Sequence, residues 1–327
     1  MANNTSVKLK ILYIMDILLE KTDEENYITV NDIITELKRH NISAERKSVY
    51  SDIELLKFYG LDIICEKGRS NKYFIASRDF ELAELKLLVD SVQSSKFITH
   101  KKSNELIKKL EKLTSSSQAK ELDRHVIVRD RVKTSNERIF YNVDRLHRAI
   151  HENKQVSFKY FDYDLNKKIE FRRNGNRYTL SPYALTWSNE HYYLISYYER
   201  YNDISNFRVD RMMDINILEK DRYLIEGYEE FNVAEYSRKI FNMYIGELET
   251  VQLEFHNSLI NVVIDKFGQD IIIRKQSDDS FKIKVEVEIS NTFLGWLFMF
   301  GNKVKIISPQ KLKDNMKKTV KEVINLY

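Results

Sequence analysis

The sequence predicts a multidomain α+β protein, and three observations support this fold class. The chain has 327 residues, which corresponds to two or three domains of ordinary size. Glycine and proline are scarce, at 8 and 2 residues, whereas 12% of the residues are aromatic, so helices and strands are expected to outweigh linkers. The spacing of apolar residues changes along the chain, from the three- and four-residue intervals of helices to the alternation of strands.

Residues 1–76 are predicted to form three helices and a hairpin. The apolar face of the first helix consists of Leu9, Leu12, Ile14, Met15, Leu18 and Leu19. A capping box, Thr29 with Asp32, opens the second helix. The inward residues of this helix are Val30, Ile33, Ile34 and Leu37. Ser43 can cap a third helix that ends at Gly60. Its inward residues are Val49, Ile53 and Leu56.

Two strands, residues 61–65 and 73–76, complete this segment, and turn-forming residues join them. Three short helices followed by a hairpin describe a winged helix-turn-helix, in which the third helix enters the DNA major groove. Residues 38–72 hold eight basic and five acidic residues, a local net charge of +3. The candidate DNA-binding residues are Arg46, Lys47, Ser48, Tyr50, Ser51, Lys57, Arg69 and Lys72. The alternative is that these charges only keep a small helical domain soluble.

The remaining chain is predicted to contain three further regions. Residues 77–140 form a helical linker or dimerisation region, in which apolar stripes recur at helical spacing. Residues 141–225 begin with a helix, residues 143–152, and continue as a twisted β-unit. Residues 235–327 follow the order βαββαβ, which suits a ferredoxin-like α/β sandwich. Asp162 and Asp164 are predicted turn residues.

Several segments resemble a known family. The segments RKSVYSDIELL at residues 46–56, YGLDI at 59–63 and GRSNKYF at 68–74 resemble the winged helix of DeoR-like, WYL-domain transcriptional regulators. Downstream, VSFKY at 156–160, SPYAL at 181–185, HYYLI at 191–195 and FRVDRM at 207–212 resemble successive strands of the WYL domain. Tyr192, Tyr193 and Leu194 stand where Trp-Tyr-Leu is expected. Residues 248–327 resemble the C-terminal extension of this domain. The resemblance implies a Sm-like or SH3-like barrel that senses a nucleotide or single-stranded nucleic acid.

The charges of the β-unit agree with an anionic effector. Residues 129–177 hold thirteen basic and seven acidic residues, a net charge of +6, interleaved with aromatic residues. Basic groups hold phosphates, and aromatic rings stack on bases. The candidate effector-binding residues are Ser157, Lys159, Tyr160, Tyr183, His191, Tyr193, Arg208 and Arg211. The competing interpretation is that the aromatic residues pack in the core and that Arg208 only pairs with Asp210.

No catalytic site, metal site or cofactor is predicted. His147 and His151 share a helix face, but Arg148 stands where a zinc protease needs glutamate. The sequence lacks the glycine-rich phosphate loops and the G-x-S-x-G turn of hydrolases. The single cysteine, Cys65, allows no internal disulfide and fits a reducing compartment. The longest uncharged run, residues 289–302, is shorter than the ~20 residues of a membrane-spanning helix. A cytoplasmic protein without a membrane partner is therefore expected.

The sequence thus predicts a ligand-responsive transcriptional regulator, expected to be a repressor, that binds a palindromic operator as a homodimer. The helices within residues 78–125 and the C-terminal sandwich are the candidate dimer surfaces. One alternative is a non-specific nucleic-acid-binding accessory protein that binds single strands through the β-unit. Another is an enzyme that turns over a nucleotide and has a regulatory N-terminal domain.

Overall fold

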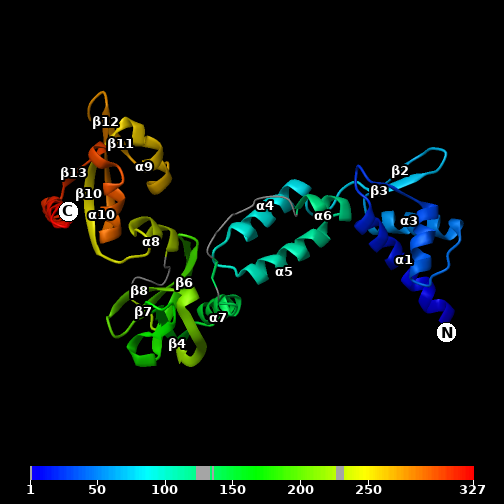
Figure 1. Ribbon diagram of the computed structural model, residues 1–327, viewed down its shortest axis with the longest axis horizontal. Coiled ribbons are helices and arrows are strands. Elements are labelled where there is room, and N and C mark those ends of the chain that lie inside the picture. Colours follow the sequence, from blue (N-terminus) through cyan, green and yellow to red (C-terminus); the bar gives the residue numbers. More distant parts are fainter. Residues whose placement is uncertain (1, 123–132, 135, 226–231) are drawn as a thin grey trace. The chain divides into compact units, whose positions relative to one another are not determined.

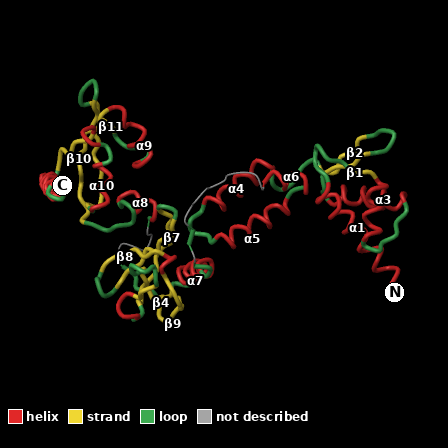
Figure 2. The backbone as a smooth tube through the Cα atoms, in the orientation of Figure 1, coloured by secondary structure: helices red, strands yellow, loops and turns green. Residues whose placement is uncertain are grey.

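The computed structural model describes residues 2–122, 133–134, 136–225 and 232–327. The chain divides into two compact units, residues 1–137 and residues 138–327. Both units mix helices with antiparallel sheets, so the structure is a multidomain α+β protein, as predicted (Figures 1 and 2). No helix of the described ranges is long and apolar enough to cross a membrane.

The N-terminal half of the first unit contains three helices and three short strands. In chain order they are α1 (Ala2–Lys21), β1 (Ile28–Thr29), α2 (Val30–Arg39), α3 (Arg46–Tyr59), β2 (Ile63–Glu66) and β3 (Lys72–Ile75). The strands form an antiparallel sheet in the order β1-β3-β2. The β2–β3 hairpin extends away from the helices (Figure 1). Three helices and a hairpin therefore follow in the predicted order.

The core of this half confirms most of the predicted helix faces. Val30, Ile33 and Leu37 of α2 and all three inward residues of α3 are buried. Thr29 and Asp32 form the predicted capping box, and Gly60 ends α3 at φ +118°. A left-handed backbone of this kind favours glycine, which has no Cβ.

Two predictions for these helices are wrong. Leu9 and Leu12 are 42% and 50% exposed, because at ~100° per residue they lie far from the face that carries Ile14 and Leu18. Ser43 does not cap α3: the helix begins at Arg46, the preceding residue Glu45 is the N-cap, and it makes no side-chain cap hydrogen bond.

The rest of the first unit is helical. It contains α4 (Leu82–Ser94), α5 (His100–Leu110), the short turn η1 (Glu111–Leu113) and α6 (Ser116–Leu122). Helices α4 and α5 run side by side (Figure 2). Leu85, Val89 and Leu122 form a small core. The apolar residues of the stripes predicted within residues 77–140 are not all buried: Phe80, Leu88 and Leu113 are exposed.

Buried polar contacts join these helices to the three-helix half. The hydroxyl of Ser115, which is fully buried, donates to the carboxylate of Asp23, two residues after α1 ends. Nη2 of Arg78 donates to the carbonyl oxygens of Leu19 and Thr22, each at 2.7 Å. These bonds satisfy carbonyls at the C-terminal end of a helix, which have no partner within the helix.

The second unit begins with a helix and a β-domain. Its elements are α7 (Ile139–His151), β4 (Lys154–Tyr163), β5 (Ile169–Phe171), the turn η2 (Arg172–Gly175), β6 (Tyr178–Ser188), β7 (His191–Tyr198), β8 (Asp203–Arg208), the turn η3 (Val209–Arg211), β9 (Met212–Asp221) and α8 (Val233–Lys239). The sheet has the order β5-β4-β6-β7-β8, and β9 also pairs with β4. Helix α7 starts four residues before its predicted start, and its buried residues Leu146 and Ala149 share a core with this sheet.

A four-stranded sheet with helices forms the C-terminal part. Its elements are β10 (Glu247–His256), η4 (Asn257–Leu259), α9 (Ile260–Phe267), β11 (Ile273–Lys275), β12 (Ser280–Ile289), α10 (Asn291–Phe298), η5 (Gly301–Lys303), β13 (Val304–Ser308) and α11 (Gln310–Ile324). The strands pair antiparallel in the order β11-β12-β10-β13. The predicted βαββαβ order is therefore present. The uncharged run at 289–302 forms α10, in which Phe293, Leu294 and Leu297 are buried.

Candidate nucleic-acid interface and effector site

The outer face of α3 carries exposed basic and hydroxyl groups. Lys47 and Ser51 are exposed on the side opposite to the buried residues of the helix, and Arg46 is exposed at its first residue. Lys57 is half-buried, and its ammonium lies 2.8 Å from Oε1 of Glu54, one turn earlier. Arg46, Lys47 and Ser51 are therefore the candidate DNA contacts of α3 whose side chains are most open to solvent.

Two other candidates on α3 are engaged within the domain. The hydroxyl of Ser48 accepts a hydrogen bond from the ammonium of Lys10 on α1. Tyr50 is half-buried, with its ring centroid 6.4 Å from that of Tyr73 on β3. Both side chains therefore help to hold α3 in place.

Lys10 is a residue that sequence reasoning missed. Its ammonium lies 2.8 Å from Oδ2 of Asp52 on α3, and the two side chains are only 9% and 14% exposed. Oδ2 of Asp52 makes no hydrogen bond of normal geometry. The contact between Lys10 and Asp52 is therefore an ion pair, stabilised by their opposite charges. Lys10 lies four residues before Ile14 on the buried face of α1. This spacing is the feature of the sequence that could have placed Lys10 in the core.

The hairpin places its two candidates differently. Arg69 is exposed in the turn between β2 and β3. Lys72 begins β3, and its ammonium lies 3.6 Å from the ring centroid of Tyr27. Arg69 is therefore at the tip of the hairpin, whereas Lys72 is at its base.

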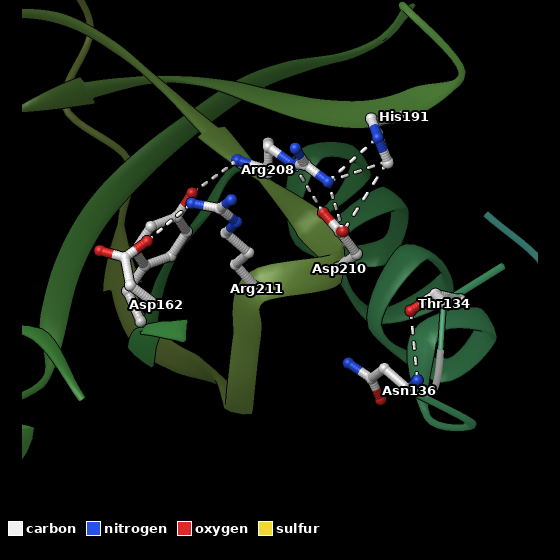
Figure 3. Close-up of polar contacts among 8 residues, drawn as sticks. Thr134, Asn136, Asp162, His191, Arg208, Asp210 and Arg211 are labelled. Carbon is white, nitrogen blue, oxygen red and sulfur yellow. Dashed lines mark hydrogen bonds and ion pairs between the residues drawn. The ribbon is translucent and has the colours of Figure 1, made fainter. Parts of the chain in front are cut away.

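In the β-domain, Arg208 joins His191 and Asp210 (Figure 3). Nε of Arg208 lies 3.1 Å from Oδ1 of Asp210, and Nη2 lies 2.7 Å from Oδ2. The same Nη2 is 3.0 Å from Nε2 of His191. Burial lowers the pKa of Arg208, but the hydrogen bonds and charge of Asp210 more than offset this effect, so the net shift is upward. The guanidinium stays charged and oriented at the end of β8.

A second cluster contains Asp162, Arg172 and Arg211. Oδ1 of Asp162 accepts from Nη1 of Arg211 at 2.6 Å (Figure 3), and Oδ2 accepts from Nε of Arg172. The hydrogen bond to Asp162 is the main cause that raises the pKa of Arg172. The prediction that Asp162 is a turn residue is wrong, because β4 extends to Tyr163. Sequence reasoning counted Arg172 only as part of the local basic excess.

Tyr160 links the two arginine clusters. Its hydroxyl accepts from the backbone N–H of Arg208 at 3.2 Å, and the guanidinium carbon of Arg172 lies 5.2 Å from its ring centroid. The ring also contacts those of Phe158, Tyr178 and Phe207. Aromatic rings and arginine groups therefore alternate in one region of this domain.

The structure gathers some of the predicted effector residues but not all of them. Tyr160 and His191 each contact Arg208, and Tyr193 pairs directly with Arg208 across β7 and β8. The side chains of cross-strand partners lie on the same face. Burial raises the pKa of Tyr193. Arg211 belongs to the Asp162 cluster.

Ser157, Lys159 and Tyr183 lie apart from this group. By strand alternation Ser157 and Lys159 point to the other side of β4 from Tyr160. Ser157 is buried and accepts from Nε of Arg177 at 3.2 Å. The hydroxyl of Tyr183 donates to the carbonyl of Tyr223 and accepts from the N–H of Ile225, each at 2.8 Å, so Tyr183 anchors the segment after β9.

The described residues contain no group of three or more His, Cys, Asp or Glu side chains that could hold a metal ion. His147 and His151 are both exposed on α7. Arg148, which lies between them, pairs with Glu152 at 2.7 Å.

The buried hydroxyl of Tyr160 gives a prediction about pH. Burial raises the pKa of Tyr160 to about 12, from 10.0. Because the folded protein holds the neutral phenol, its contribution to stability is complete below pH 10 and is lost as the pH rises towards 12. The melting temperature of the β-domain should therefore fall over this range. Tyr160→Phe should reduce the slope of melting temperature against pH, whereas Tyr163→Phe, which changes an exposed ring, should leave it unchanged. Equal slopes for both variants and the parent would contradict the assignment.

Comparison with known proteins matches two parts of the second unit. Residues 141–217 match the WYL domain, and residues 247–324 match the WCX domain. A curated relative, the uncharacterized HTH-type transcriptional regulator YobV of Bacillus subtilis (strain 168), is 21% identical over 146 residues, which are 45% of this chain and 45% of the relative. The solved structure of proteasome accessory factor B/C (PafBC) of Arthrobacter aurescens aligns with 97% of this chain and 48% of its own, at 13% identity and a TM-score of 0.29.

The alignments thus span less than half of the length of either similar protein. The chain carries a WYL domain followed by a WCX domain, and a transcriptional regulator is among its relatives. The two domain matches and this relative support a WYL-domain transcriptional regulator.

Proposed function

We propose that this protein is a ligand-responsive transcriptional repressor that binds a palindromic operator as a homodimer. The observation that carries the proposal is α3, where Lys47 and Ser51 are exposed opposite the buried core residues and Arg46 is exposed at the start of the helix. Such side chains can contact phosphates and base edges in the major groove. A regulator of this kind acts in the cytoplasm and needs neither a catalytic group nor a cofactor.

The order of elements supports specific folds for the domains. Three helices with the β2–β3 hairpin correspond to a winged helix-turn-helix, for which we retain the DeoR-like assignment. The order β9-β4-β6-β7-β8, with η3 before the last strand, suits an SH3-like or Sm-like barrel. The order β13-β10-β12-β11, with α9 and α10 in the connections, suits a ferredoxin-like sandwich.

We further propose that the WYL domain senses a nucleotide or a single-stranded nucleic acid. Arg208, Arg172 and Arg211 can bind phosphates, and Tyr160 lies in contact with two of them. Binding at this site would favour one of two states that differ in affinity for operator DNA.

The homodimer follows from the size of one DNA contact. A single winged helix covers only a short half-site, so two-fold pairing is needed for a specific operator. Leu87 of α4 is 68% exposed, with Phe80 and Leu88 exposed nearby in sequence. Apolar side chains of this kind support the helices within residues 78–125 as one dimer surface.

Selection of random duplex DNA by the full-length protein tests the primary proposal. We expect an enriched inverted repeat, and footprinting should protect two half-sites. Enrichment of no sequence over random DNA would exclude a specific operator.

A second candidate function is non-specific binding of single strands through the WYL domain. The observation in its favour is the pairing of arginine with aromatic rings, because Arg173 also lies over Tyr178, at 4.9 Å, as Arg172 does over Tyr160. This function predicts equal affinity for single strands of any sequence and no preference among duplexes. Consumption of a nucleotide by the purified protein would instead favour an enzyme.

A further inference from the structure

The carboxylate of Asp162 lies between two arginines that come from separate turns. Arg172 belongs to η2 and Arg211 to η3, whereas Asp162 lies near the end of β4. Each oxygen of Asp162 accepts from a different guanidinium, Oδ1 from Arg211 at 2.6 Å and Oδ2 from Arg172. One carboxylate thus bridges two cations, and the cluster keeps a net charge of +1.

This arrangement has the chemistry of a phosphate site. Guanidinium groups bind carboxylates and phosphates with the same fork of N–H donors. A phosphate has more oxygens than a carboxylate, so it can accept from both arginines at once and still face solvent. Arg172 also lies over the ring of Tyr160, which places this cluster beside an aromatic ring.

Asp162 is accessible to a competing ligand. The side chains of Arg172, Asp162 and Arg211 are 51%, 36% and 31% exposed, and ion pairs open to water are weak. Asp210 differs, because it is only 12% exposed and holds Arg208 through two hydrogen bonds from a position two residues away. Asp210 therefore orients its arginine, whereas Asp162 can be displaced.

We propose that Asp162 occupies the position that a phosphate group of the effector takes between Arg172 and Arg211, so that effector binding must displace this carboxylate. The inference rests on the proposed function for the identity of the effector, but not for the anion site itself. Asp162 thereby sets a threshold: a ligand replaces it only if its phosphate oxygens accept hydrogen bonds from both Arg172 and Arg211.

The test measures two ligands on the full-length protein. The first is inorganic pyrophosphate, followed by calorimetry, and the second is a fluorescein-labelled hexathymidylate, followed by anisotropy. Asp162→Asn keeps the shape of the side chain and removes its charge. It should tighten the binding of both ligands by about fivefold, the amount expected when competition from an exposed ion pair is lost. Asp162→Ala should do the same, which controls for any bond that the new amide makes.

Glu170→Gln is the matched control. Glu170 is exposed and is the cross-strand partner of Asp162, so its carboxylate lies on the same face, and the substitution removes the same charge. Both affinities should stay within about twofold of the parent, since an exposed charge without a direct contact is screened. In the double variant Asp162→Asn/Arg172→Ala, the gain in affinity for both ligands should disappear.

The outcomes separate this inference from the proposed function. An unchanged or weaker affinity for pyrophosphate in both Asp162 variants, or an equal gain in Glu170→Gln, overturns the inference. If pyrophosphate behaves as expected but the oligonucleotide binds no variant, the anion site stands and nucleic-acid sensing fails. If the oligonucleotide binds the parent and all variants equally, sensing stands and the role of Asp162 is wrong.

Discussion

Lys47→Ala is expected to weaken binding to the selected operator by roughly 5- to 150-fold, which corresponds to about 1 to 3 kcal/mol for the loss of a base-edge contact. Lys47 is exposed near the start of α3, where the first turn of a recognition helix meets the bases. Fluorescence anisotropy at fixed salt, with the operator and a scrambled duplex, measures the effect. The scrambled duplex should lose much less affinity than the operator.

Two other variants distinguish recognition of the base sequence from attraction to the DNA phosphates. Arg69→Ala, at the hairpin tip, should weaken all duplexes alike and lower the slope of log affinity against log salt by about 1. Lys318→Ala removes the same charge from α11 and should change neither affinity. If Lys47→Ala lowered affinity for operator and scrambled DNA equally, Lys47 would be a phosphate contact rather than a base contact.

Lys10→Met is expected to destabilise the first unit by about 3 kcal/mol or more, because it leaves the buried carboxylate of Asp52 without a counter-charge. Hydrogen exchange of the α3 amides is the suitable measurement. Both tryptophans, Trp187 and Trp296, lie in the second unit, so tryptophan fluorescence does not report on the first. The same variant should weaken operator binding, since Lys10 fixes α3 through Ser48 and Asp52.

The double variant Lys10→Met/Asp52→Leu is the control for this interpretation. Replacing both members of a buried pair by apolar groups is often neutral or stabilising. Exchange protection should therefore recover in the double variant. Unchanged protection in Lys10→Met alone would show that the ion pair does not hold α3.

The sequence predicted the helices of the first unit well where apolar spacing was regular. Val49, Ile53 and Leu56 recur at helical spacing, and all three are buried. The prediction failed for Leu9 and Leu12, because an apolar residue on a helix is buried only if another element covers its face. The buried position nearby belongs to Lys10, whose charge is compensated by a residue 42 positions later that no local pattern reveals.

The candidate effector site shows the same division. The strand motifs at 191–195 and 207–212 placed His191, Tyr193 and Arg208 on one site, and the structure brings these three together. Arg172 was missed as a site residue, because its position depends on a turn in which Arg173 and Asn174 adopt φ values of 55° and 54°. Left-handed backbone at two consecutive non-glycine residues is uncommon and has no reliable sequence signal.

The sequence by itself determined the α+β class, the order of helices and strands, and the two basic regions, because these depend on residue spacing and composition within short segments. Only the tertiary structure decided which charges are compensated. Lys10 with Asp52, and Asp162 with Arg172 and Arg211, join residues from different elements. Such pairs form where strands and helices meet after folding, so distance in space, rather than distance in sequence, sets their charge balance.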